Sequence, residues 1–550
     1  MDFFGATANR EPRRLRWGGS QFRVGALALM MLGLPSASAQ QNGEARVGEY
    51  RNPVLFADYS DPDVIRDGED FYLIASSFHF VPGIPVLHSK DLVHWEISGH
   101  VLPRLTISPT YDMVGGARYG GGVWAPAVRF HSGLFYLYFP TPDEGIFVST
   151  APKMTGPWSA PEAVLPGRGY EDPCPFWDDN GEAYLVHSKL GAGPLILHRM
   201  SADGKHVLDD GKVIVQDTVN LPTLEGPKFY KRHGWYYIFA PMGGVGKGSQ
   251  AVLRSRNIYG PYEHRIVLAQ GKTSVNGPHQ GGWVDGTDGR GWFLHFQQRG
   301  AHGRIVWLEP LRWENDWPVV GSAPPGASTG EPVETYALPA HVAAAADYSP
   351  QTSDDFNSQT LSPMWEWNHN PDDSRWSLTE RPGYLRLHPG MADSLLHARN
   401  TLTETMQNES LEVVAHLDVT HMADGDRAGL SVFDRSLSGV GVSRQNGVFS
   451  LYFTLSGHDT AGPPMPDTSK DTIQLRVRIH DNTAAYSYSL DNGQSFHALG
   501  HPVALIFSWW KGARPALFAF NEQTVSSGFV DFDAVDYSPL SENADIEAKD

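Results

Sequence analysis

Three acidic residues recur at comparable places in the chain, each within two residues of a proline and ahead of an aromatic strand. They are Asp61 in YSDPDVI, Asp172 in GYEDPCPFW and Glu225 in TLEGPKFY. An acid at such a loop-to-strand junction can point into a cavity. Two carboxyl groups facing one cavity can divide a hydrolysis, one activating water and the other protonating the leaving group. For a single DPD triplet the competing interpretation is that Asp61 and Asp63 only shape a turn.

The elements that would position these acids are short aromatic strands. Five segments repeat a glycine turn followed by an aromatic strand, at intervals of roughly 50–65 residues. The turns are at Gly68, Gly133, Gly181, Gly234 and Gly291. One four-stranded blade per repeat predicts a five-bladed β-propeller over residues 45–340, whose inner strands would bring the three acids to one channel. A β-sandwich or several small β domains is the alternative, since aromatic strands alone do not fix closure.

A second domain follows a change of composition between Ser322 and Ser353, where Ala, Pro, Gly and Ser dominate. Beyond it, short alternating strands joined by polar turns predict an antiparallel β-sandwich over residues 353–540. The fold class we expect is therefore all-β. Trp365 and Trp367 are expected to be buried against the propeller, which would make the second domain necessary for more than solubility.

Residues 1–39 have the composition of an export signal. Five arginines precede an apolar run from Val24 to Leu34, and a small-residue cleavage site ends at Ala39. We expect removal of this segment and a periplasmic or extracellular location, with Arg13-Arg14 leaving twin-arginine export open as the route. The apolar run is too short to span a bilayer and no later run of about 18 apolar residues exists, so membrane anchoring is not expected.

Charge and cysteine content exclude several classes of partner and site. The formal net charge is −19 at pH 7, and it becomes about −22 when residues 1–39, with a charge of +3, are removed. This disfavours nucleic acid and acidic polymers as partners, whereas a neutral substrate would not be repelled. Cys174 is the only cysteine, which excludes an internal disulfide and a metal site built from several cysteines.

The same segments resemble glycoside hydrolase family 43 along the whole propeller. The resemblance rests on NPVLFADYSDPDVIRDGEDFYLIASSF, GGVWAPAVRFHSGLFYLYF, EDPCPFWDDNGEAYLV, LEGPKFYKRHGWYYIFA, NGPHQGGWV and RGAHGRIVWLEPLRWENDWPVVG, in the family's order. The second domain resembles the concanavalin-A-like sandwich of its β-xylosidase branch. This implies an exo-acting, inverting glycosidase that releases xylose from β-xylosides and xylo-oligosaccharides of hemicellulose, or an α-L-arabinofuranosidase acting on arabino-oligosaccharides. A non-catalytic carbohydrate-binding propeller would be favoured if one acid were replaced, and none is.

By this resemblance, Asp61 corresponds to the general base, Glu225 to the general acid and Asp172 to the residue that orients the acid and tunes its protonation. Inverting hydrolysis needs the base and the acid about 6.5–9.5 Å apart, with room for water. A third carboxylate would favour the protonated form of the acid. The neighbouring acids Asp58, Asp63 and Glu171 compete for these roles. Strand alternation predicts that Glu171 points away from the side that Asp172 faces, and Asp63 is expected to bond local backbone.

The resemblance also implies residues around the sugar. Phe78 and Trp124 would stack on the sugar ring and Arg299 would bond its hydroxyls, although core packing is the alternative for each aromatic ring. His279 corresponds to a histidine of the central channel that lies beside a bound calcium or water. A lone histidine is a poor metal site, so an ion there would be structural and no cofactor is expected to be required.

Overall fold

The computed structural model describes residues 48–339, 350–466 and 473–541. These described residues all belong to one compact unit. The described residues form strands and turns with four short 3-10 turns and no α-helix. No helix in these ranges is long and apolar enough to cross a membrane. The export signal expected over residues 1–39, with cleavage after Ala39, lies outside the described residues.

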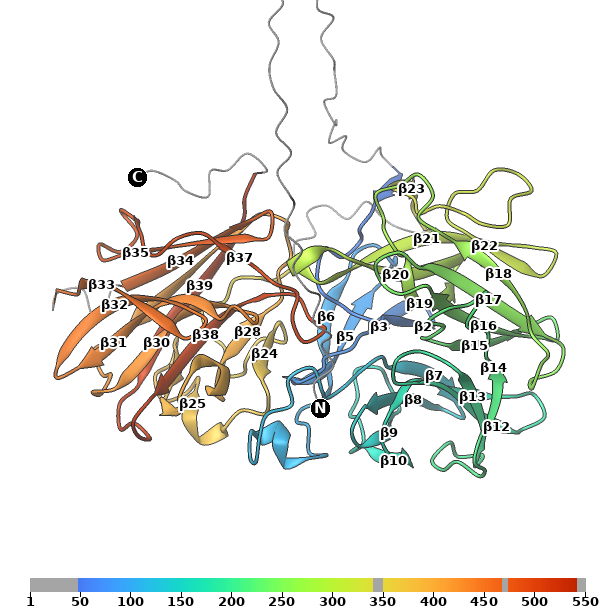
Figure 1. The fold of residues 1–550 in the computed structure, drawn as a ribbon, viewed down its shortest axis with the longest axis horizontal. Helices are drawn as coiled ribbons and strands as arrows, with labels where there is room; N and C mark the ends of the chain where they lie inside the picture. The colour runs from blue at the N-terminus through green and yellow to red at the C-terminus, as the bar shows by residue number, and fades with distance from the viewer. Residues whose placement is uncertain (1–47, 340–349, 467–472, 542–550) are drawn as a thin grey trace, which may run out of the picture. The chain divides into compact units, whose positions relative to one another are not determined.

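Five four-stranded antiparallel sheets follow one another along the chain and form the blades of a β-propeller (Figure 1). The strands, blade by blade, are β2(Asp63–Asp67), β3(Asp70–Ile74), β5(Gly83–Ser89) and β6(Glu96–Leu102); β7(Ala127–His131), β8(Leu134–Thr141), β9(Gly145–Ala151) and β10(Glu162–Pro166); β11(Tyr170–Trp177), β12(Ala183–Lys189), β13(Leu195–Met200) and β14(Lys212–Val215); β15(Lys228–Arg232), β16(Trp235–Met242), β17(Ser249–Ser255) and β18(Glu263–Leu268); and β19(His279–Asp285), β20(Gly291–Gln298), β21(Arg304–Glu314) and β22(Trp317–Val320). The five-bladed propeller predicted from the glycine-aromatic repeat is confirmed.

The first strands of the blades form a ring around the central channel. β2 contacts both β7 and β19, and β11 contacts both β7 and β15. Aromatic side chains fill the space between blades, as where Tyr237 and Phe239 pack with Phe293 and Trp317 of the next blade. The ends of the propeller are joined by pairing of β1(Glu49–Arg51) with β23(Thr335–Ala337). Closure therefore comes from packing around the ring and from this short terminal ribbon.

The remainder of the described chain forms two larger sheets that pack as a β-sandwich, confirming the second predicted fold. One sheet has the order β33(His458–Pro464), β32(Val448–Leu455), β31(Ser438–Gln445), β30(Asp426–Phe433), β38(Arg514–Asn521), β28(Leu402–Glu404), β24(Trp365–Asn368) and β4(Phe80–Val81), with β27(Gly390–Met391) beside β38. The other has the order β25(Trp376–Ser377), β26(Leu385–Leu387), β39(Val530–Pro539), β29(Leu411–Asp418), β34(Ile473–His480), β35(Thr483–Ser489) and β36(His497–Ala498), with β37(Val503–Ala504) beside β35.

The strand that carries the two predicted interface tryptophans joins the two domains through its backbone. β24 pairs with β4, which lies in the chain between two strands of the first blade, and Trp367 is opposite Val81. The side chains of Trp365 and Trp367 are buried in the core of the sandwich, so the prediction that they pack against the propeller is wrong. Residues two apart on a strand share one face, and here that face is turned toward the other sheet of the sandwich.

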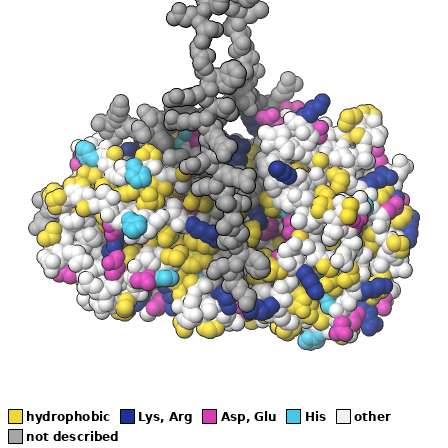
Figure 2. Space-filling view, in the orientation of Figure 1, with side chains coloured by type: hydrophobic (Ala, Val, Ile, Leu, Met, Phe, Trp, Pro, Cys, Tyr) yellow, Lys and Arg dark blue, Asp and Glu magenta, His cyan; other side chains and the backbone are white. Residues whose placement is uncertain are grey.

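Charged side chains of both signs are interspersed among the coloured residues of the face shown in Figure 2.

Candidate active site

Each blade contributes to one cavity of about 420 Å³ at the beginning of its first strand. The contributing residues include Asp61, Trp124, Asp172, Glu225 and His279, one from each blade in order. Phe78 lines the same cavity. The structure thus brings together residues separated by more than 200 positions, because the inner strands of a propeller start at a common mouth.

Asp61 is held by two donors at the floor of this cavity. Its Oδ2 accepts a hydrogen bond of 2.6 Å from Ser76 Oγ, and its Oδ1 accepts one of 2.9 Å from Arg304 Nη1. The side chains of Asp61 and Arg304 are 8% and 7% exposed, so their ion pair is largely shielded from solvent. Asp61 has φ of 55°, in the left-handed region that Asp tolerates better than most residues. Because Asp61 precedes β2 and has a positive φ, its carboxylate does not follow the alternating side-chain directions of that strand.

Asp172 and Glu225, from the third and fourth blades, form a second group of acids in the cavity. Asp172 Oδ2 accepts hydrogen bonds from Ser188 Oγ at 2.9 Å and from the backbone N–H of Gly226 at 2.8 Å. Glu225 Oε1 lies 2.9 Å from His279 Nε2, a contact in which either atom carries the proton. The bond from Gly226 ties the loop of Glu225 to Asp172. Glu225 therefore has its position fixed from two neighbouring blades.

Glu171 lies in the same cavity, contrary to the expectation from strand alternation. Oxygens of Glu171, Asp172 and Glu225 lie within 4.8 Å of one another. The alternation is broken because Asp172 has φ of 53° and the pairing register of β11 with β12 shifts between Glu171 and Cys174. This bulge lets adjacent residues face one pocket.

Burial and the closeness of these carboxyl groups raise the pKa of two of them, Glu171 and Asp172. Burial, followed by repulsion from Asp172 and Glu225, raises the pKa of Glu171 to about 8. Burial, followed by repulsion from Glu225, raises the pKa of Asp172 to about 6, against the bonds from Gly226 and Ser188 that favour its charge. The cluster therefore holds protons into the neutral range, as a site that donates a proton requires.

Arg299 does not line the cavity, and Arg304 stands in the position expected for it. Arg299 precedes the 3-10 turn Gly300–His302, and its side chain is 45% exposed and pairs with Glu409 of the sandwich. The chain returns to the cavity only after this turn, at the first residue of β21. Of the two arginines in this motif, the turn therefore leaves Arg304, and not Arg299, in the lining of the cavity.

The sandwich contributes one aromatic side chain to the cavity. Trp510 is 48% exposed, and its ring centre lies 6.0 Å from that of Trp124, which in turn lies 6.1 Å from that of Phe78. Trp510 was not identified from sequence, although the run SWWKG offers a signal. Trp509 and Trp510 both have positive φ, so this segment is a loop and one of the two rings is left uncovered.

The loop that carries Trp510 is anchored beneath Asp61 by Asp58. Lys511 Nζ lies 3.0 Å from Asp58 Oδ2 and donates to the backbone oxygen of Asp58 at 2.9 Å, and Gly512 N–H donates to the same carboxylate at 3.0 Å. The other oxygen, Asp58 Oδ1, accepts from the backbone N–H of Arg304 at 2.8 Å. Asp58 thus links the sandwich loop to the arginine that holds Asp61.

Asp63, the other competing acid, is fully buried away from the cavity. Its Oδ1 accepts from its neighbour Val64 N–H at 3.1 Å, and its Oδ2 accepts from Val128 N–H at 3.0 Å and Arg129 Nη1 at 2.8 Å. It therefore joins the first two blades rather than facing substrate.

Of the two occupants expected beside His279, a calcium ion or a water, the residues there do not fit the calcium ion. Its Nε2 is engaged by Glu225, and its buried Nδ1 is a single nitrogen without a protein partner, whereas Ca²⁺ takes six to eight oxygen ligands. The carboxyl cluster of Glu171, Asp172 and Glu225 offers oxygens, but a cation there would displace the protons it holds.

Known proteins share both domains of this chain. Residues 50–318 match the model of the glycosyl hydrolases family 43, and residues 353–538 match that of the beta xylosidase C-terminal concanavalin A-like domain. A protein of Xylanibacter ruminicola, provisionally named a beta-xylosidase, is 44% identical over 86% of this chain and 86% of its own length.

Two other relatives carry different names. A beta-xylosidase of Formosa agariphila is 33% identical over 90% of this chain and 91% of its own length. A non-reducing end alpha-L-arabinofuranosidase of Bacteroides ovatus is 34% identical over 66% of this chain and 68% of its own length. Among solved structures, a bifunctional GH43-CE protein of Bacteroides eggerthii superposes with a TM-score of 0.80 at 30% identity, covering 89% of this chain and 64% of that chain.

Proposed function

Because the chain belongs to glycosyl hydrolases family 43 and is a glycosidase, we propose that it is an exo-acting, inverting β-xylosidase in which Asp61 is the general base and Glu225 the general acid. The observation that carries the proposal is that acids in two different surroundings line one cavity. Asp61 faces cationic and hydroxyl donors, whereas Glu225 lies beside two buried carboxyl groups, Glu171 and Asp172, whose pKa values are raised.

The proposed chemistry follows from these surroundings. Asp61, oriented by Arg304 and Ser76, accepts a proton from a water molecule, which attacks the anomeric carbon. Glu225 gives its proton to the glycosidic oxygen, and the bond to His279 orients that carboxyl. Asp172 holds the loop of Glu225 through Gly226 N–H and repels negative charge on its neighbours. A single displacement of this kind inverts the anomeric configuration.

The aromatic wall supports the exo-acting part of the proposal. Phe78, Trp124 and Trp510 bound one side of a cavity of about 420 Å³, which suits a terminal sugar and its neighbour. The aromatic rings cover the apolar face of a sugar, and Arg304 and Gln280 present donors to its hydroxyls.

An α-L-arabinofuranosidase with the same mechanism is the second candidate, favoured by the relative from Bacteroides ovatus. Hydrolysis of an aryl β-xyloside and an aryl α-L-arabinofuranoside, compared side by side, decides between them. We expect the larger kcat/KM on the xyloside. Proton NMR in the first minutes should then show α-xylose, and β-xylose appearing first would contradict the inverting mechanism. We also propose that the enzyme is exported after cleavage near Ala39, which N-terminal sequencing of the mature protein tests.

A further inference from the structure

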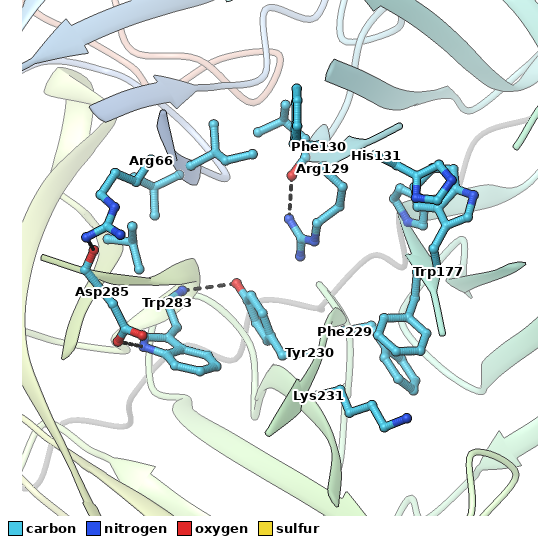
Figure 3. A pocket seen from close by; sticks show the side chains of 16 residues that line it. Arg66, Arg129, Phe130, His131, Trp177, Phe229, Tyr230, Lys231, Trp283 and Asp285 are labelled. Atoms are coloured by element: carbon cyan, nitrogen blue, oxygen red, sulfur yellow. Dashed lines mark hydrogen bonds between the residues drawn. The ribbon is translucent and has the colours of Figure 1, made fainter. Parts of the chain in front are cut away.

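A second cavity, of about 410 Å³, opens at the opposite end of the central channel (Figure 3). The catalytic cavity is lined by the beginnings of the five inner strands, and this distal cavity is lined by their ends. Each inner strand contributes a large side chain to it, namely Arg66, Phe130, Trp177, Tyr230 and Trp283. The distal cavity is therefore built by the whole ring of blades.

A buried polar layer separates the two cavities. Arg129 donates to Asp63 at 2.8 Å and to Cys174 Sγ at 3.1 Å, and Lys228 donates to the backbone oxygen of Pro126 at 2.6 Å. Asp63, Cys174 and Lys228 have no appreciable solvent exposure. A molecule in the distal cavity would consequently be bound outside the reach of the catalytic acids.

The lining of the distal cavity is aromatic with polar edges. Phe130 is 56% exposed although it lies on an inner strand, where an apolar ring would otherwise be covered. The His131 and Trp177 rings are stacked 4.5 Å apart, and Tyr230 and Trp283 meet edge to face at 5.2 Å. These contacts hold the rings in fixed positions around the opening, as Figure 3 shows for the labelled side chains.

Polar groups stand between these rings. Arg66 Nη1 donates to the backbone oxygen of Asp285 at 3.1 Å, and Asp285 Oδ1 accepts from Trp283 Nε1 at 3.0 Å. Arg66 and Asp285 are themselves exposed at the rim. Fixed aromatic rings beside charged rim groups offer both surfaces that a sugar presents, its apolar ring face and its hydroxyls.

We propose that the distal cavity is a second, non-catalytic carbohydrate site that holds a segment of a xylo-oligosaccharide, with Phe130 as its exposed stacking ring. The choice of sugar rests on the proposed function. The cationic side chains of the lining are already engaged, Arg129 with Asp63, Lys231 with Asp178 and Arg66 with backbone oxygens, which disfavours a polyanion. The cavity nearly equals the catalytic one in volume. The one carboxylic acid in its lining, Asp285, lacks the second acid that hydrolysis needs.

The test uses the full-length mature protein with Glu225→Gln, so that ligand is bound and not cleaved. Xylohexaose is titrated by calorimetry, and migration is measured in gels containing soluble xylan. Phe130→Ala in this background should weaken the second binding event about tenfold, which corresponds to about 1.4 kcal/mol, and abolish retardation by xylan, because the exposed stacking ring is lost. Phe130→Trp should restore both.

Tyr336→Ala is the matched control, since Tyr336 is also an exposed aromatic residue, 40% exposed, and does not line either cavity. It should leave binding unchanged. Retardation and a binding isotherm unaffected by Phe130→Ala would overturn the proposal, as would a single binding event in the Glu225→Gln protein. The proposed catalytic function is tested separately, by measuring hydrolysis of an aryl β-xyloside. The Phe130→Ala enzyme with Glu225 intact should have the same kcat as the unmodified enzyme.

Discussion

Replacing Lys511 with Met should damage catalysis from within the sandwich domain. Lys511 and Asp58 are each 2% exposed, and the lysine is the cation bonded to that carboxylate. Burial by itself would raise the pKa of Asp58, but the charges of Lys511 and Arg514 and the N–H groups of Arg304 and Gly512 outweigh burial and lower it. Asp58 is therefore an ionised group whose charge depends on a residue more than 450 positions away.

The size of the effect follows from the cost of an unpaired buried charge. Removing one partner of a buried ion pair destabilises a protein by about 3–5 kcal/mol. The substitution should also affect the active site. Asp58 accepts a hydrogen bond from the backbone N–H of Arg304, and the side chain of Arg304 donates to Asp61. A displacement of Asp61 by about 1 Å should lower kcat ten- to a hundredfold.

The assay is a double-mutant cycle of Lys511→Met and Asp58→Asn, read by urea unfolding and by kcat on an aryl xyloside. The double variant should recover at least about 2 kcal/mol relative to the sum of the single variants. Arg386→Met is the control, since it breaks a largely buried pair with Asp531 inside the sandwich that bonds neither Asp58 nor Arg304. It should lose stability while kcat stays near the unmodified value. Additive single effects, or an unchanged kcat in Lys511→Met, would refute the reasoning.

Three further outcomes follow from the acids of the site. Asp61→Asn should keep the fold and lose 10²–10⁴-fold or more in kcat, since an amide cannot take the proton from water; near-normal turnover of an aryl xyloside would remove Asp61 from the mechanism. Glu225→Ala should spare aryl xylosides relative to xylobiose, because a good leaving group needs little protonation, and equal losses would count against its role as acid. Glu171→Gln should raise the melting temperature at pH 9 but not at pH 4. Folding raises the pKa of Glu171 from its ordinary value of 4.5 to about 8. The stabilising contribution of the protonated carboxyl is therefore fully present below pH 4.5 and is lost as the pH rises through 8.

A chain ending near Pro339 should melt earlier and hydrolyse more slowly than the full protein. Truncation removes β24, which pairs with β4, together with Lys511 and Trp510. The measurements are thermal unfolding and kcat/KM on an aryl xyloside. Equal values for both proteins would show that the two domains are independent.

Local patterns in the sequence were enough to predict the propeller, the sandwich and the set of acids. A glycine turn and an aromatic strand recurring five times determine a blade each, because both the turn and the alternation are encoded by neighbouring residues. The acids before proline followed the same repeat, so Asp61, Asp172 and Glu225 could be placed at comparable strand starts. The ring of blades then brought them together.

Tertiary structure decided the details that depend on single backbone angles and on contacts between distant segments. The positive φ of Asp172 and the register shift beside it turned Glu171 into the cavity, where alternation predicted the reverse. Because the 3-10 turn Gly300–His302 follows Arg299, it is Arg304 that reaches the cavity and bonds Asp61. Trp510 and Lys511 reach the site from the other domain, and no local pattern encodes a contact across more than 380 residues. Sequence periodicity specifies which way a regular strand faces, whereas bulges, turns and domain packing are fixed only by the summed contacts of the folded chain.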